Sequence, residues 1–293
     1  MKVSEMLRSG RPSVSFEVFP PKKDAAFEPV MEAVSELCAL RPSFMSVTYG
    51  AGGGANVNTL SVARHIMSCG VVPLAHLTCL TSTREKVQDE LAALRMAGVE
   101  NILALRGDRP AGAPDAPLPG CYSHASDLVE VISQVGGFCV GGACYPEGHP
   151  ECEHLSADIA NLRKKVDAGV DFLTSQMFFD NNIFYRYLAK VREAGVDVPV
   201  IPGIMPVTNA KQIRRICALS GTDLPNRFKM IVDRFGGNAD DMMTAGIAYA
   251  TEQIIDLFAN GISAVHIYTM NRPETAERIM ANLRGIIGDG ERA

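Results

Sequence analysis

Two acidic residues stand in apolar segments, where a carboxylate is costly to place. Glu17 lies inside the segment 13–20, and Asp108 closes the segment 101–108. Both segments are short, apolar and ended by Pro or Gly, a pattern typical of buried strands. A buried carboxylate has to be paired, solvated within a site or kept protonated. The two acids therefore predict a working pocket rather than a scaffold.

Each acid suits a different chemical role. Glu17 is flanked by Phe16 and Val18, so we expect its pKa to be raised and the carboxyl to act as a general acid near neutral pH. Asp108 follows Gly107, a residue type that lets a ligand approach the backbone closely. As a carboxylate, Asp108 would stabilise positive charge that develops on a ligand.

A repeated pattern along the chain predicts the elements that position these acids. Helical patterns end in Gly, an apolar residue follows, and a strand begins, as expected when Gly occupies the C′ position of a helix. The predicted strands are 13–20, 44–50, 71–79, 101–107, 138–146, 172–179, 198–206 and 264–270. The predicted helices are 27–40, 57–68, 83–97, 125–135, 156–168, 183–194, 210–219 and 272–287. Thr83 and Ser156 are the expected N-caps of two of them.

Eight apolar strands, each followed by a helix, predict an α/β fold of the closed (β/α)8 TIM-barrel type. The alternative is an open doubly wound sheet, which needs a Gly-rich turn after its first strand. Here Phe19 is followed by two Pro and two Lys, which cannot form that turn. Further helical patterns at 225–235 and 240–259 predict extra helices between strands seven and eight. We expect residues 1–293 to form a single domain.

Composition narrows the class of protein. The chain has 293 residues, 47% of them hydrophobic, and a net charge of -5, which lacks the basic footprint of a nucleic-acid binder. It contains no apolar stretch of about 18 residues that would span a membrane, and its start lacks the apolar core of a signal peptide. The eight cysteines include no CxxC pair and fit reduced, mostly buried thiols. We therefore expect a cytoplasmic protein without nucleic-acid or membrane partners.

Polar residues recur at the carboxyl ends of the predicted strands, where TIM barrels place their active sites. They are Glu17, Thr48, His76, Arg106, Asp108, Tyr145, His149, Gln176 and Arg272. Each also has a purely structural interpretation, such as a core histidine for His76 or an ion-pair partner for Arg106. Nearly every strand supplies a polar group at the same end, and this regularity favours a site.

The same strand ends carry a family resemblance. The segments 15–21, 47–50, 76–78, 105–108, 145–150, 176–180, 202–206 and 266–272 together resemble methylenetetrahydrofolate reductase, in the family's order and over nearly the whole chain. The resemblance implies a barrel that binds FAD without a Rossmann turn. It implies ping-pong hydride transfer from NADH or NADPH through the flavin to 5,10-methylenetetrahydrofolate, giving 5-methyltetrahydrofolate. It also implies a homo-oligomer, and leaves open whether the product serves methionine synthesis or carbon fixation.

The resemblance assigns roles to individual residues. Glu17 matches the general acid that helps to open the folate's five-membered ring to an iminium, and Asp108 matches the acid beside flavin and pterin. Gln176 matches a folate-binding glutamine, and Gln212 and Arg272 match further substrate-binding positions. The positions that match flavin-binding residues are Thr48, His76, Arg106, Gly107, Asp108, Tyr145, His149, Asp158, Asn161 and Lys165.

One position departs from the family pattern and leaves the electron donor open. The family often has a Phe that stacks on nicotinamide or on the folate side chain, and here the aligned residue is Ile216. Three electron donors stay open: NADH, NADPH, and the iron–sulfur partner subunit that serves some short relatives.

Two other functions also stay open. One is a barrel methyltransferase or metal-dependent lyase with Cys144, His149 and Cys152 as ligands, although their spacing matches no standard zinc pattern. The other is a ligand-binding barrel without catalysis.

Overall fold

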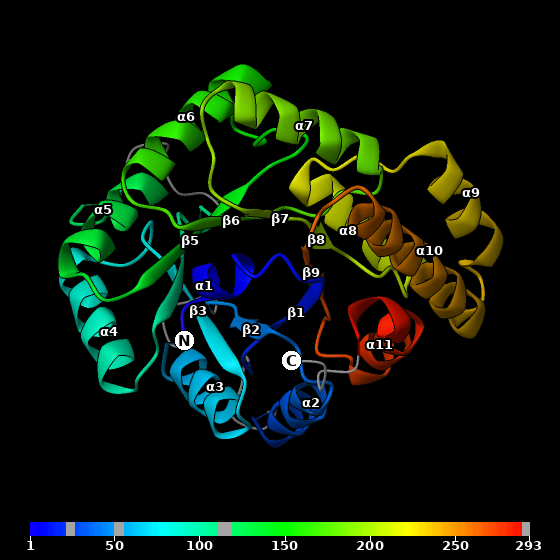
Figure 1. The fold of residues 1–293 in the computed structure, drawn as a ribbon, viewed down its shortest axis with the longest axis horizontal. Coiled ribbons are helices and arrows are strands. Elements are labelled where there is room, and N and C mark those ends of the chain that lie inside the picture. The colour runs from blue at the N-terminus through cyan, green and yellow to red at the C-terminus, as the bar shows by residue number, and fades with distance from the viewer. Residues whose placement is uncertain (22–26, 50–55, 110–118, 289–293) are drawn as a thin grey trace.

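A computed structural model describes residues 1–21, 27–49, 56–109 and 119–288 of the chain, and its strands form a parallel barrel surrounded by helices (Figure 1). The strands are β1 (Ser13–Val18), β2 (Phe44–Val47), β3 (Val72–Thr78), β4 (Asn101–Leu105), β5 (Cys139–Cys144), β6 (Phe172–Ser175), β7 (Val200–Ile201), β8 (Gly203–Ile204) and β9 (Ala264–Tyr268). The helices are α1 (Val3–Leu7), α2 (Phe27–Ala39), α3 (Asn56–Ser68), α4 (Arg84–Met96), α5 (Ala125–Val135), α6 (Leu155–Asp167), α7 (Asn181–Glu193), α8 (Ala210–Ser220), α9 (Asn226–Phe235), α10 (Ala239–Ala259) and α11 (Pro273–Ile287).

The barrel closes through a divided strand. The sheet order is β7-β6-β5-β4-β3-β2-β1-β9-β8, and its two ends are separated in the chain only by Pro202. β7 pairs with β6 and β8 pairs with β9, both in parallel. The predicted seventh strand therefore exists, but in two pieces, because Pro202 has no backbone N–H to give to the ladder. The (β/α)8 prediction is confirmed.

The interior of the barrel is apolar towards the amino ends of the strands. Alternate residues of each strand face inward, and seven of them form one buried cluster with Val3 of α1: Phe44, Leu74, Leu103, Cys139, Phe172, Ile201 and Ala264. Figure 1 shows α1 across the centre of the ring, where the Val3 N–H donates to Asn101 Oδ1 at 2.8 Å. The sequence did not predict α1, because five residues are too few for helical periodicity to appear.

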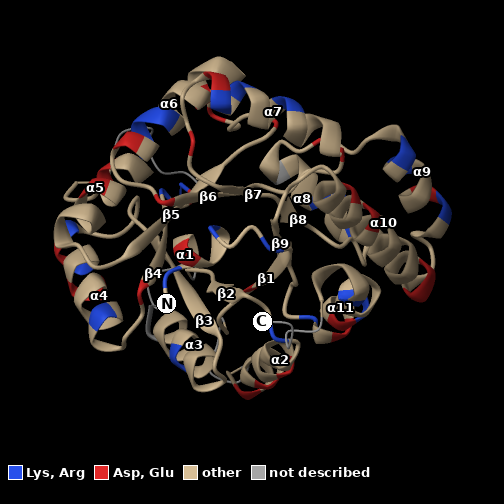
Figure 2. Ribbon diagram, in the orientation of Figure 1, with Lys and Arg blue, Asp and Glu red and all other residues tan. Residues whose placement is uncertain are grey.

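The helices other than α1 form the outer layer and carry most of the charge, as Figure 2 shows. Thr83 caps α4 as predicted, its hydroxyl accepting from the Lys86 N–H at 3.3 Å. Ser156 is not a cap, because α6 begins at Leu155 with His154 in the N-cap position. No helix of the described chain is both long and apolar enough to cross a bilayer.

The predicted extra helices are α9 and α10, and they follow α8 before the last barrel strand. Gly246 lets α10 approach the loop after β8, since a Cβ at this position would lie 1.8 Å from the Val207 carbonyl oxygen. This close contact fixes the loop that leads into α8.

Candidate active site

Glu17 points into the barrel near the carboxyl end of β1 and is 9% exposed. Burial raises its pKa to about 8, and the neighbouring Ser46 hydroxyl opposes part of this rise. The expected direction is confirmed, but the expected cause is wrong. Phe16 and Val18 belong to the cluster between strands and helices, because successive strand residues face opposite ways. The barrel interior, not these neighbours, desolvates the carboxyl.

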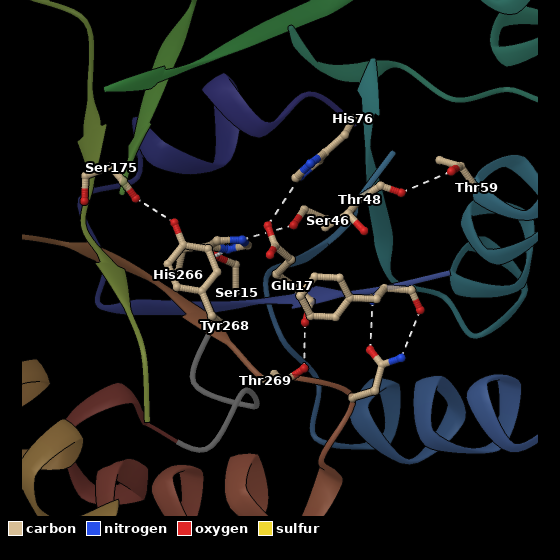
Figure 3. A network of polar contacts seen from close by, with 12 residues as sticks. Ser15, Glu17, Ser46, Thr48, Thr59, His76, Ser175, His266, Tyr268 and Thr269 are labelled. Atoms are coloured by element: carbon tan, nitrogen blue, oxygen red, sulfur yellow. Dashed lines mark hydrogen bonds and ion pairs between the residues drawn. The ribbon is translucent and has the colours of Figure 1, made fainter. Parts of the chain in front are cut away.

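His76 of β3 lies beside Glu17, with its Nε2 3.5 Å from Glu17 Oε2 (Figure 3). Burial lowers the pKa of His76 to about 3, so the imidazole is neutral at the pH where Glu17 is protonated. Within the described residues its buried Nε2 has no hydrogen-bond partner. Both side chains are therefore uncharged near neutral pH, and no hydrogen bond joins the two atoms that face each other.

The turn after β9 holds the end of β1. Thr269 Oγ1 donates to the Glu17 carbonyl at 2.6 Å, and the Asn271 side chain bonds both the N–H and the carbonyl of Phe19, at 2.8 and 2.9 Å. Met270 and Asn271 have positive φ values of 54° and 53°, a conformation uncommon outside glycine. Sequence reasoning missed Thr269 and Asn271, although an Asn just after a strand is a recognisable turn signal.

Four residues with predicted cofactor roles meet beyond β5. The rings of Tyr145 and His149 are 4.7 Å apart, and the backbone N–H of His149 donates to Asp158 Oδ2 at 3.3 Å. Lys165 Nζ donates to the Ala143 carbonyl, and burial lowers its pKa. Burial also raises the pKa of Asp158 and lowers that of His149. The structure thus brings these four residues together as a partly buried polar group.

Arg106, just after β4, forms a two-point ion pair with Glu151, and its Nη2 lies 2.7 Å from Glu151 Oε1. The hydrogen bond to the guanidinium lowers the pKa of Glu151 to about 2. Sequence reasoning did not select Glu151, because its partner lies 45 residues away.

The expectation that Asp108 is a buried strand acid is wrong. β4 ends at Leu105, and Asp108 is exposed. Gly107 adopts φ +87°, a backbone conformation that turns the chain away from the strand. Glu17 and Asp108 nevertheless lie towards the same face of the barrel, because β1 and β4 belong to one parallel sheet.

The remaining predicted residues are more dispersed. Thr48 is half-buried, and its carbonyl accepts from Thr59 Oγ1 at 3.1 Å. Asn161 is exposed on α6, with its Nδ2 4.0 Å from Cys152 Sγ. Gln176, half-buried after β6, uses its own Oε1 to accept from the Met177 N–H at 2.9 Å.

A groove beside the barrel mouth contains three positions selected from the sequence. Gln212, Ile216 and Arg272 line it together with Met270 and the loop 205–209. Arg272 Nη1 donates to Thr208 Oγ1 at 2.7 Å. The structure therefore places two of the three predicted substrate residues, and the position that departs from the family pattern, in one depression.

The alternative metal site finds no support in the described part of the chain. The Cys144 thiol is buried among apolar side chains, and burial raises its pKa to about 12, with a hydrogen bond to Tyr187 opposing this. His149 instead contacts Tyr145 and Asp158. Among the residues placed here, no three His, Cys, Asp or Glu side chains are grouped as metal ligands.

Solved structures resemble this barrel. A Clostridium thermocellum protein described as binding two copies of 5-methyl-5,6,7,8-tetrahydrofolic acid matches with a TM-score of 0.68, covering 97% of this chain and 99% of its own, at 12% identity. Oxaloacetate acetylhydrolase matches with a TM-score of 0.55 at 13% identity, covering 99% of this chain and 88% of its own. At such identities the likeness concerns the fold alone.

Sequence comparisons identify a family as well as a fold. The family model for methylenetetrahydrofolate reductase matches residues 2–284. The 5,10-methylenetetrahydrofolate reductases of Pectobacterium carotovorum and Escherichia coli are each 34% identical, with 94% of this chain and 91% of theirs covered. Methylenetetrahydrofolate reductase (NADH) 1 of Arabidopsis thaliana is 34% identical over 99% of this chain, which spans about half (51%) of the plant protein's length. The chain belongs to the methylenetetrahydrofolate reductase family.

Proposed function

We propose that the protein is a flavoenzyme that reduces 5,10-methylenetetrahydrofolate to 5-methyltetrahydrofolate, using FAD and electrons from NADH or NADPH. The observation that carries the proposal is Glu17, a buried acid with a pKa raised to about 8 at the mouth of the barrel, in a chain of this family. We also propose that the protein forms a homo-oligomer, that it is cytoplasmic, and that residues 1–293 form a single domain.

The described residues fit a flavin. His76 offers a buried nitrogen without a hydrogen-bond partner among the described residues. Gly107 has no side chain, so a ligand can approach its backbone closely. Arg106 and Lys165 place two cationic groups near the polar cluster around Tyr145, a charge that suits a diphosphate. The residues proposed to hold FAD are Thr48, His76, Arg106, Gly107, Asp108, Tyr145, His149, Asp158, Asn161 and Lys165. When bound, FAD supplies a two-electron carrier between the nicotinamide and the folate.

Glu17 supplies the proton that opens the folate ring. Its proton passes to one nitrogen of the five-membered ring, the bond from that nitrogen to the bridging carbon breaks, and the electron pair stays on the nitrogen. The carbon becomes an iminium on the other nitrogen, and one hydride then makes it a methyl group. In this proposal Asp108 stabilises the cation, and the amide of Gln176 binds the folate. In sum, the folate takes up one hydride and one proton.

This assignment predicts that folate reduction fails at high pH. Protonated Glu17 is the active form, so the rate is full well below its pKa of about 8 and is lost as the pH rises through that value. The measurement is the pre-steady-state reoxidation of reduced enzyme by methylenetetrahydrofolate at a series of pH values. Flavin reduction by NADH, followed over the same range, is the control. A folate rate that stays level to well above this pKa would contradict the assignment.

A spectral titration tests the function as a whole. Purified protein is expected to be yellow, to bleach with a reduced nicotinamide and to regain its colour with methylenetetrahydrofolate. Parallel titrations with NADH, with NADPH and with neither identify the donor, and failure of both nicotinamides in a yellow, folate-active protein points to a partner subunit. Colourless protein without turnover supports a ligand-binding barrel, and bound metal found by elemental analysis supports the lyase or methyltransferase.

A substitution at Ile216 tests where the donor binds. Ile216 is half-buried in the groove with Gln212 and Arg272, so Ile216→Phe would place an aromatic face there. Stacking on nicotinamide is expected to lower the KM for NADH by about threefold to tenfold. Steady-state kinetics measure the change, and Ile216→Leu, which adds no ring, is the matched control. An equal effect of both substitutions would exclude stacking as the cause.

A further inference from the structure

Glu151 belongs to the loop between β5 and α6 and pairs with a cation at the mouth of the barrel. Its two carboxylate oxygens contact Nη1 and Nη2 of Arg106, and the contact to Nη2 measures 2.7 Å. The Glu151 side chain is 51% exposed and the Arg106 side chain 22%. The carboxylate therefore occupies the outer edge of the guanidinium, and a ligand from solvent can reach the pair.

The backbone fixes both ends of this contact. The Arg106 carbonyl accepts from the N–H groups of Cys79 and Leu80, at 3.2 and 2.9 Å. The Glu151 N–H donates to His149 Nδ1 at 3.1 Å. The two charged side chains can thus separate by rotation about their own bonds, while the chain segments that carry them stay in place.

The pair leaves no surplus positive charge on the guanidinium. The hydrogen bond from Arg106 lowers the pKa of Glu151 to about 2, so the carboxylate is charged near neutral pH. The same hydrogen bond is the main cause that raises the pKa of Arg106, and the negative charge of Asp108 adds to the rise. An anionic ligand that approaches Arg106 therefore meets a cation already balanced by a carboxylate.

We propose that Glu151 is the resident counter-anion of Arg106 and competes with the diphosphate of a bound dinucleotide for the guanidinium. Carboxylate and phosphate both bind a guanidinium through two oxygens, so both use the same edge of Arg106. Glu151 then limits the affinity for the cofactor and takes no part in hydride or proton transfer. The choice of FAD as the dinucleotide rests on the proposed function, whereas the competition rests on the ion pair.

Glu151→Gln tests the competition, because it removes the charge and nearly keeps the shape. FAD is expected to bind flavin-free protein about threefold to tenfold more tightly, since its diphosphate no longer has to displace a carboxylate. Titration followed by the fluorescence of the flavin measures the Kd. Glu153→Gln is the matched control, an exposed acid in the same loop, and should leave the Kd unchanged. Unchanged or weaker FAD binding in Glu151→Gln would overturn the proposal.

Ligands that contain only part of FAD locate the effect. ADP carries a diphosphate without the flavin ring, and riboflavin carries the ring without any phosphate. Glu151→Gln should tighten the binding of ADP by a factor similar to that for FAD and leave the binding of riboflavin unchanged, as calorimetry can measure. An equal gain for riboflavin would show that the substitution acts on the ring site, and would refute competition for the diphosphate.

A double-mutant cycle assigns the effect to the guanidinium. Arg106→Gln is expected to weaken FAD binding, because the site loses its accessible cation. In that background Glu151→Gln should no longer tighten FAD binding, since no guanidinium remains to be released. A gain that persists in full would indicate a general effect of negative charge and would exclude the proposed pairing. Thermal unfolding of each flavin-free variant establishes that the compared proteins are folded.

The outcomes separate this inference from the proposed function. A native protein that binds FAD and reduces folate, but whose Kd for FAD does not depend on Glu151, would overturn the inference alone. A native protein that binds no FAD would overturn the proposed function. In that case the dependence of ADP binding on Glu151 still decides whether the carboxylate competes with a diphosphate.

Discussion

Replacing Glu17 by Gln is expected to slow folate reduction by about 10² to 10⁴-fold, the usual contribution of a general acid. The amide has nearly the same shape as the carboxyl and can still contact His76 and Ser46, but it has no acidic proton to give. Reduction of the flavin by the nicotinamide does not use this proton and should proceed at the native rate. Stopped-flow measurement of the two half-reactions separates these outcomes.

A second carboxyl whose pKa is raised by burial provides the matched control. Glu90 of α4 is half-buried, its pKa is also raised by burial, and it accepts from the Tyr49 hydroxyl at 2.8 Å. It lies on an outer helix, so Glu90→Gln should leave both half-reactions unchanged. Normal folate turnover in Glu17→Gln, or equal losses in the two variants, would end the assignment of Glu17 as the acid.

Replacing Gly246 by Ala is expected to destabilise the barrel by about 3 kcal/mol. The added Cβ would lie 1.8 Å from the backbone oxygen of Val207, and a backbone atom cannot move aside as a side-chain end can. Either α10 or the loop after β8 has to shift. That loop includes Thr208, which holds Arg272 in the groove, so folate binding should weaken as well. Urea unfolding measures the stability, and the KM for folate measures the second effect.

Gly285 offers the opposite case within a helix. It lies in α11, and a Cβ there would meet no atom within 4 Å. Gly285→Ala is therefore expected to stabilise the protein by about 0.5 to 1 kcal/mol, because alanine restricts the unfolded chain and favours the helix. If Gly246→Ala costs no more stability than an ordinary surface substitution, then α10 is not pressed against Val207.

Local sequence patterns determined the order of the elements and the face on which the site lies. Apolar runs ended by Gly or Pro mark strands, and 3.6-residue periodicity marks the helices between them, so a parallel barrel follows from short-range information. Polar residues at the strand ends then fall on one face, because parallel strands all end together. Glu17 illustrates both the reach and the limit of such patterns: its burial and the direction of its pKa shift were predicted from the apolar segment, whereas the groups that desolvate it come from the barrel interior.

Only the tertiary structure decided which atoms meet. Ser15 and His266 are 251 residues apart in the chain, and Ser46 and His266 are 220 apart, yet the register of β9, β1 and β2 makes them neighbours. Whether Asp108 is buried depends on the backbone turn at Gly107, which the adjoining apolar run does not encode. Periodicity specifies which way a side chain faces, whereas its partners depend on strand register, a property of pairing between distant segments. The acid was therefore visible in the sequence, and the contacts among its distant neighbours were not.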